Sequence, residues 1–272
     1  MKARGFTLIE LVMVIMITGI LAASLTVFLK PAVDSYFDTR RRADLTDMAD
    51  TALRRMSQDI RSAVPNSVRS VSTTCFQLVP TIAGGRYRMA PDTVTAGSAT
   101  LDTSVATLAF DVLSPLGQIP GVGDWVVIDN QTSNDVYNNV NRGAISTVDT
   151  PPPAPGGAVV GQHRINVASK QFPIGYDGGR FVVVPNATQT IFYSCVGNTL
   201  YRTVATFAAV QATTCALTTG AVVATDVAAC SFVYDPNQGA TQQSGFVWMR
   251  LELSRSGESA ALAHGVHVDN VP

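Results

Sequence analysis

Residues 6–29 form an uninterrupted apolar run, FTLIELVMVIMITGILAASLTVFL, in which Glu10 is the only charged residue. At 1.5 Å per residue, a helix of this length extends about 36 Å, enough to cross a hydrocarbon core of about 30 Å. The run is longer than the apolar part of a secretory signal peptide, and no A-x-A cleavage site follows it. The sequence therefore predicts a membrane-spanning helix over residues 6–29.

Glu10 is the costly residue of this run, because a charged side chain within the bilayer costs on the order of 2.5–3.5 kcal/mol. It lies about one helical turn from the start of the run. A nearby cation would offset the cost of the carboxylate. The position of Glu10 therefore predicts a positively charged partner.

The helix is expected to continue out of the membrane over residues 30–65, with a bend at Lys30-Pro31 and an end near residues 63–66. Arg40, Arg41 and Arg42 interrupt the apolar pattern, and their place beyond the apolar run opposes the positive-inside rule. Apolar residues at spacings of three and four predict one apolar face of this amphipathic helix: Val33, Tyr36, Phe37, Leu45, Met48, Ala49, Ala52, Leu53, Met56 and Ile60.

Residues 66–272 are expected to form a β-rich head. Strands are predicted over residues 75–79, 107–113, 125–128, 164–167, 181–184, 191–195 and 200–204. The clearest alternation, residues 246–253, belongs to a predicted C-terminal meander over residues 229–268. Residues 151–157 are rich in proline and glycine and predict an exposed loop, within a lobe inserted over about residues 100–184. A long helix packed on an antiparallel sheet gives an α+β fold.

Charge and cysteine content narrow the possible functions of this head. A formal net charge of −1 gives no electrostatic reason to expect nucleic acid as a partner. The four cysteines, an even number in an exported region, predict disulfides. We favour Cys195 with Cys215 and Cys75 with Cys230, although other pairings and free thiols stay open.

Residues 4–11, RGFTLIEL, resemble the processing signature of type IV prepilins and of type II secretion pseudopilins. The resemblance implies a leader of residues 1–5, cleavage by a prepilin peptidase between Gly5 and Phe6, and N-methylation of Phe6. It also implies that Glu10 pairs with the Phe6 amine of a neighbouring subunit, which would supply the cation predicted above.

Four further segments, CFQLVP at 75–80, NTLYR at 198–202, CSFVYD at 230–235 and HVDNVP at 267–272, are similar to the O-type minor pilins of MSHA (mannose-sensitive haemagglutinin) pili. That resemblance implies a structural subunit, anchored in the inner membrane with a periplasmic head and later assembled into a pilus or at its tip. The implied partners are other pilin subunits, the prepilin peptidase and the inner-membrane assembly platform. Two alternatives are a J-like minor pseudopilin of type II secretion and a tip adhesin that binds a glycan or surface.

Catalytic and metal-binding patterns are not found, and we expect no enzyme activity, no metal and no cofactor. His264 and His267 are three positions apart, so on a strand they would point to opposite faces, and His163 is remote in sequence. The polar residues 129–135 are compatible with Ca²⁺, but a solvated turn is favoured. For Trp125 and Trp248, packing is favoured over a sugar-binding platform.

Overall fold

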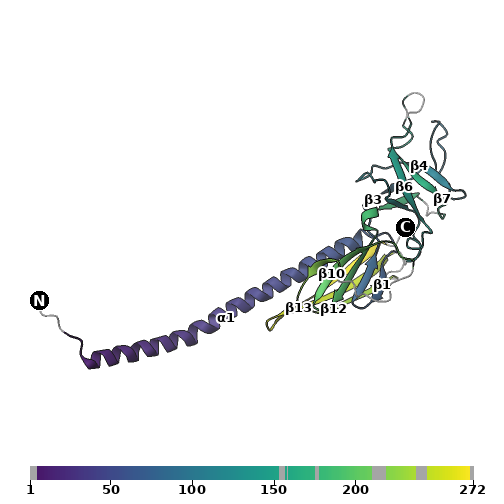
Figure 1. The fold of residues 1–272 in the computed structure, drawn as a ribbon. Coiled ribbons are helices and arrows are strands. Elements are labelled where there is room, and N and C mark those ends of the chain that lie inside the picture. Colours follow the sequence, from purple (N-terminus) through teal and green to yellow (C-terminus); the bar gives the residue numbers. More distant parts are fainter. Residues whose placement is uncertain are drawn as a thin grey trace.

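The computed structural model describes residues 5–152, 157, 159–174, 178–209, 219–236 and 244–269. The helix α1, Leu8–Arg61, protrudes from the head as a curved rod (Figure 1). It passes through Pro31 without a break. It ends at Arg61, slightly before the predicted stop. The Ser62 N–H donates to the Gln58 carbonyl, and the Ala63 N–H donates to the Ile60 carbonyl.

The strands of the head, together with one 3₁₀ turn η2 (Asn186–Thr188), have the following bounds: β1 Arg69–Ser72, β2 Cys75–Leu78, β3 Ala83–Arg86, β4 Thr107–Val112, β5 Trp125–Val127, β6 Arg142–Asp149, β7 His163–Lys170, β8 Arg180–Val184, β9 Thr190–Val196, β10 Thr199–Ala205, β11 Ala221–Ala224, β12 Val227–Asp235, β13 Ser244–Arg255 and β14 Glu258–Asp269. All seven of the shorter strands predicted from the sequence are present, as are the strand at 246–253 and the last strand. The α+β prediction is confirmed, while β1, β3, β6 and β11 were not predicted.

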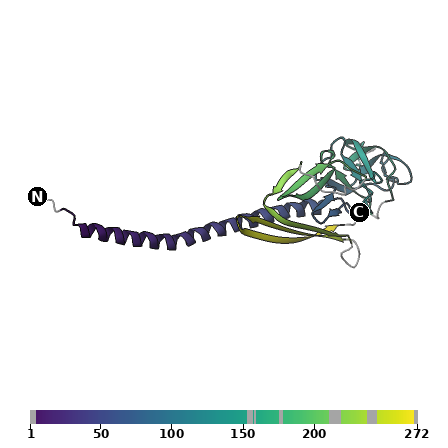
Figure 2. The same ribbon diagram turned by 60° about the horizontal axis from the view of Figure 1, so that its bottom comes forward.

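The described strands of the head form three antiparallel sheets: β1-β2-β9-β10-β11, β12-β13-β14, and β3-β8-β5-β6-β7-β4. The second half of α1 lies along the first two sheets (Figures 1 and 2). Its buried face, which includes Leu45, Leu53 and Met56, shares one core with residues of both sheets. These two sheets and the helix therefore form one packed body.

The head buries the predicted apolar face only in the second half of the helix. Leu45, Ala49, Ala52, Leu53, Met56 and Ile60 are buried. Val33, Tyr36 and Phe37 are exposed, because the head packs against α1 only beyond them. The apolar exposed surface of α1 therefore continues past residue 29.

The six-stranded sheet forms a separate lobe with its own core, built around Phe110, Ile165 and Phe181. It extends from Ala83 to Val184 and so begins before the expected residue 100. Its two ends leave and re-enter the body between β2 and β9, which are hydrogen-bonded neighbours with Leu78 opposite Ile191. The lobe is thus an insertion between two paired strands.

The junction between lobe and body has a third apolar cluster, which joins Val64 and Val79 to Val127, Val136 and Tyr137. The Tyr137 hydroxyl donates to the Ser67 carbonyl at 2.9 Å. The guanidinium of Arg69 lies 3.5 Å from the centre of the Tyr137 ring, and its Nε donates to the Ser133 carbonyl. Residues 129–135 therefore help to attach the lobe.

The disulfide pairing proposed from the sequence is wrong. Cys195 on β9 is bonded to Cys230 on β12, at a sequence separation of 35. Cys75 is also disulfide-bonded, and Cys215 lies outside the described residues. Because β9 and β12 belong to different sheets, the Cys195–Cys230 bond joins the two sheets of the body.

Candidate functional site: the N-terminal segment

The predicted cleavage site lies in an exposed segment before the helix. Gly5, Phe6 and Thr7 precede the first helical residue, Leu8, and the Phe6 side chain is 82% exposed. A Cβ atom added at Gly5 would meet no atom within 4 Å. The chain's own fold therefore does not require glycine at this position.

Thr7 and Glu10 form a reciprocal capping box at the start of α1. The Thr7 backbone N–H and hydroxyl both donate to Glu10 Oε2, at 3.0 and 2.9 Å, and the Glu10 N–H donates to Thr7 Oγ1 at 3.4 Å. These bonds satisfy backbone donors that otherwise have no partner at a helix start. In this single chain, Glu10 therefore stabilises its own helix terminus.

The capping role of Thr7 was missed in the sequence, although the T-x-x-E spacing of Thr7 and Glu10 is the signature of a capping box. The helix cap and the expected pairing with a neighbouring amine would use the same carboxylate of Glu10. Glu10 Oε2 accepts both bonds from Thr7, and Glu10 Oε1 takes part in neither of them. An added cation can therefore approach the carboxylate without breaking the cap.

The first half of α1 exposes apolar side chains around its whole circumference. By length and composition the helix is suited to cross a membrane, and its apolar window has a mean hydropathy of 2.5 with no buried residue. The hydroxyls of Thr18, Ser24 and Thr26 donate to carbonyls four residues earlier. Polar groups in this segment are therefore satisfied within the helix, as an apolar surrounding demands.

Arg41 and Arg42 each form an ion pair, Arg41 within α1 and Arg42 with the head. Arg41 pairs with Asp38 at 2.8 Å, and Arg42 pairs with Glu258, the first residue of β14, at 2.8 Å. The Arg42 contact ties the helix to a hairpin far away in sequence. Of these two arginines, Arg42 therefore helps to attach the helix to the head.

Tyr193 on β9 and Arg202 on β10 form hydrogen bonds with Asp59 near the end of α1. Tyr193 Oη donates to Asp59 Oδ2 at 2.7 Å, and Arg202 Nε donates to the same oxygen at 2.8 Å. Burial is the largest cause that raises the pKa of Tyr193, and the nearby Asp59 carboxylate raises it further. Tyr193 therefore stays a protonated donor to Asp59.

The three histidines are dispersed over β7 and β14, and His267 packs edge-on against Phe246. Among the residues that the structure describes, no three His, Cys, Asp or Glu side chains gather where they could hold a metal ion. Trp125 contacts Phe207 and donates to Asn186. Trp248 is 45% exposed on the outer face of β13, stacked beside Phe246.

Residues 129–135, considered above for Ca²⁺, form a hydrogen-bonded turn. Asn130 Nδ2 donates to the Pro65 carbonyl, and Asn130 Oδ1 accepts from the Val136 N–H. The Thr132 N–H and hydroxyl donate to the Asp135 carboxylate. These oxygens are thus engaged by donors from the chain.

Comparison with known proteins identifies a family motif at the N-terminus. Residues 1–26 match the family described as the prokaryotic N-terminal methylation motif. No curated protein matches the chain, and no solved structure matches it. With the apolar helix and the exposed Gly5-Phe6 bond, the match supports a protein of the type IV pilin or pseudopilin kind, anchored in a membrane before assembly.

Proposed function

We propose that this chain is a minor pilin of an MSHA-type pilus, processed by prepilin peptidase between Gly5 and Phe6 and then assembled into the pilus or at its tip. The observation that carries the proposal is the methylation motif on a helix whose first half has no partner within the described chain. A subunit of this shape exchanges lipid for neighbouring helices on assembly. No catalytic role is assigned to the head.

Cleavage at Gly5 creates a new amine at Phe6, four residues before Glu10. A helix that packs beside an identical helix brings the amine of one subunit within reach of the Glu10 carboxylate of another. In an apolar surrounding this pairing offsets the cost of the buried charge. Glu10 would thus both cap its own helix and set the register between subunits.

The exposed apolar surface supports the same role. It continues from Phe6 to Phe37, beyond the residues needed to cross a bilayer. Val33, Tyr36 and Phe37 lie between the membrane-spanning segment and the head, where no part of the described chain covers them. Neighbouring helices in a fibre would cover these residues.

The Glu10 proposal is tested with two variants that separate the charge from the cap. Glu10→Gln keeps a side chain that suits a capping box but removes the charge. Thr7→Ala removes the hydroxyl bonds of the cap but keeps the carboxylate. We expect both proteins to be cleaved at Gly5, and at least a tenfold loss of Glu10→Gln from sheared pili with little loss of Thr7→Ala.

The intact mass of the mature protein shows whether the leader has been removed and whether a methyl group has been added. A protein that still begins at Met1 would contradict the proposal, as would pili that incorporate Glu10→Gln as well as wild type. Recovery of the subunit in a type II secretion pseudopilus instead of a pilus would replace the MSHA-type minor pilin with a J-like minor pseudopilin.

A further inference from the structure

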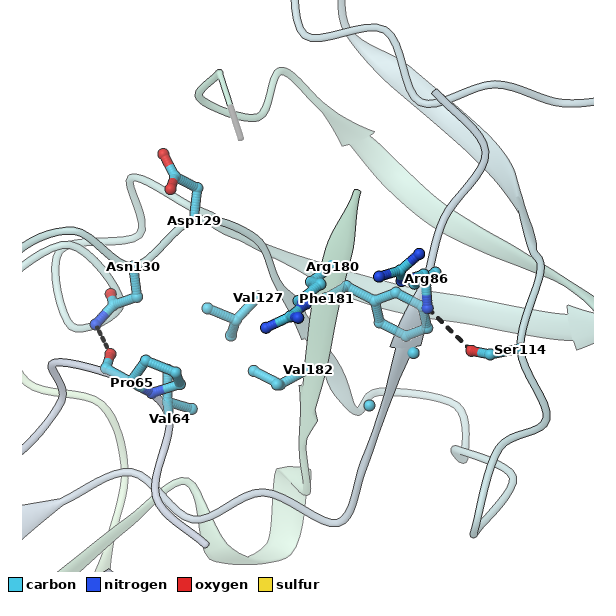
Figure 3. A pocket seen from close by; sticks show the side chains of 12 residues that line it. Val64, Pro65, Arg86, Ser114, Val127, Asp129, Asn130, Arg180, Phe181 and Val182 are labelled. Atoms are coloured by element: carbon cyan, nitrogen blue, oxygen red, sulfur yellow. Dashed lines mark hydrogen bonds between the residues drawn. The ribbon is translucent and has the colours of Figure 1, made fainter. Parts of the chain in front are cut away.

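A cavity of about 420 Å³ lies where the inserted lobe meets the segment that leaves α1. Val64 and Pro65, from that segment, line one end of it (Figure 3). Val127 on β5 and Val182 on β8 lie opposite each other in the sheet and form its floor. Binding sites for small organic molecules have volumes of about 300–1,000 Å³. The cavity therefore has the size of such a site and an apolar floor.

Two arginines line the rest of the cavity. Arg86 on β3 and Arg180 on β8 are directly opposite each other in the antiparallel ladder. Like charges in this arrangement repel each other and destabilise the strand pair. Both residues are exposed, and within the described ranges neither guanidinium forms an ion pair. An anion between the two guanidinium groups would remove the repulsion and accept charge-assisted hydrogen bonds.

Two other arginines of the lobe show what this pair lacks. Arg164 lies 2.7 Å from Asp111, and Arg88 lies 3.6 Å from Asp92. The chain therefore supplies carboxylates to these arginines and leaves the pair in the cavity to an external anion.

The backbone that carries Arg86 is held on both sides. On one side β3 pairs with β8. On the other side the Arg86 N–H donates to Ser114 Oγ, and its carbonyl accepts from the Leu113 N–H. The Cβ atoms of directly opposed residues in such a ladder are about 4.5–5.5 Å apart, so both guanidinium groups can reach one small head group. The two arginines are therefore placed as a clamp.

The charges around the cavity favour a ligand with a single negative charge. Asp129 also lines the cavity, and Figure 3 shows its carboxylate pointing away from Arg86 and Arg180. Against this one carboxylate, the two guanidinium groups leave an excess of one positive charge. A carboxylate matches this excess and the planar donor fork of arginine, whereas a phosphate dianion exceeds the charge.

The floor provides room for an apolar body attached to this head group. Figure 3 shows the Arg180 guanidinium turned toward Val127 and Val182. Gly84, opposite Val182 on β3, has no side chain that could cover the floor. Val182 and Pro65 are only half-buried and can be reached from solvent. A hydrocarbon chain can therefore lie along the valines toward Pro65.

We propose that this cavity binds a small aliphatic monocarboxylate, with the carboxylate between Arg86 and Arg180 and the hydrocarbon chain on Val127 and Val182. Charge-assisted hydrogen bonds hold the head group, and removal of apolar surface from water holds the chain. A ligand in this position contacts both the lobe and the segment that leaves α1. The inference rests on the cavity alone and does not depend on the proposed role of the N-terminal helix.

The test uses the full chain in detergent and calorimetry with three probes: hexanoate, hexanamide, which lacks the charge, and acetate, which lacks the chain. We expect hexanoate to bind at least tenfold more tightly than either of the others. The double variant Arg86→Gln, Arg180→Gln should lose the preference over hexanamide. Val182→Thr should reduce the preference over acetate about fourfold, as expected for one buried methyl group.

Arg250→Gln is the matched control, because it removes an exposed arginine on β13 outside the cavity. It should retain both preferences. All proteins are measured in the same detergent, so binding of a probe to micelles is common to every variant. Because Arg86 and Arg180 are exposed, the double variant should unfold within a few degrees of wild type, which confirms that its fold is intact.

Equal affinities for hexanoate and hexanamide, no binding of hexanoate, or a preference that survives in the double variant would overturn the proposal. Acetate that binds as tightly as hexanoate would contradict the role of the valine floor. Inorganic phosphate is expected to bind at least tenfold more weakly than hexanoate, and tighter binding of phosphate would replace the monocarboxylate site with a phosphate site.

Discussion

At the scale of single residues, Asp129 shows a local conflict between backbone, burial and charge. Its φ of 53° lies in the left-handed region, which non-glycine residues other than Asn and Asp seldom adopt. The residue is 6% exposed, and its Oδ2 accepts from Gln131 Nε2 at 2.7 Å, while Oδ1 has no partner within the described chain. Burial raises the pKa of this carboxyl group, and the charge of Asp135 raises it further.

We expect Asp129→Asn to raise the melting temperature at pH 7. A pKa above the unfolded value of 3.8 means that the folded state binds the proton more tightly, so the charged form of Asp129 destabilises the fold. This penalty disappears once the carboxyl is protonated in both states, and the advantage of Asn should therefore shrink towards pH 3. Thermal unfolding at both pH values is the measurement. A gain of equal size at both would show that backbone preference, and not charge, is responsible.

At the scale of elements, β13 shows how one strand separates a core face from an outer face. Val247, Met249, Leu251 and Leu253 are all buried, as their alternation predicts. Trp248 and Arg250 are on the exposed face. Since β13 is the central strand between β12 and β14, its buried side chains contact the helix core directly.

Leu251→Ala is therefore expected to destabilise the protein by about 2–5 kcal/mol, because it leaves a cavity in the core shared with α1. Arg250→Ala, on the opposite face of the same strand, should change stability by about 0.5 kcal/mol or less. Urea unfolding of the full chain in detergent compares the two variants. Similar losses of unfolding free energy for the two variants would contradict the assignment of one face of β13 to the core and the other to the surface.

The Cys195–Cys230 bond also acts between elements, because it links β9 to β12, which belong to different sheets. Closing a loop of this separation stabilises by about 4 kcal/mol in the chain-entropy model. The double variant Cys195→Ala, Cys230→Ala should lose about that amount in chemical unfolding. Peptide mapping without reduction should recover the two cysteines in one cross-linked peptide pair, and a pair containing Cys195 with Cys215 would contradict the assignment.

At the scale of the whole molecule, the lobe and the body are two folding cores that meet at a small junction. Of the residues between 83 and 184 that the structure describes, none belongs to the core of the body. At the base of the lobe the Ile82 N–H donates to the Val183 carbonyl at 2.9 Å, so the two chain ends are adjacent. Insertions with adjacent ends are tolerated because they require little rearrangement of the parent fold.

Replacing residues 82–184 with a short glycine-rich linker should therefore leave a body that still folds and still forms the Cys195–Cys230 bond. We expect the free energy of unfolding to fall by about 3 kcal/mol. Val64 and Val79 become exposed when the lobe is removed, and burial of each valine contributes roughly 1.5 kcal/mol. Cooperative thermal unfolding and mapping of the disulfide are the measurements. A truncated chain without a cooperative transition would show that the lobe is part of the body's core.

Local periodicity explains which elements the sequence predicts. The apolar run, the apolar spacing from Leu45 to Ile60 and the alternation of β13 each depend on neighbours within a few residues, so their type is readable without the fold. Short strands such as β3, with two glycines in four residues, carry no such pattern. Their hydrogen-bonded neighbours, which are distant in sequence, determine that they are strands.

The sequence by itself determined the membrane-suited helix, the Thr7–Glu10 spacing at its start and the α+β class, because each is set by residues close together along the chain. Only the tertiary structure decided the partner of Cys195, the exposure of Val33 to Phe37 and the meeting of Arg86 with Arg180. These depend on pairings between segments tens of residues apart. Many such pairings are compatible with the local preferences of the chain, and packing of the complete core selects one of them.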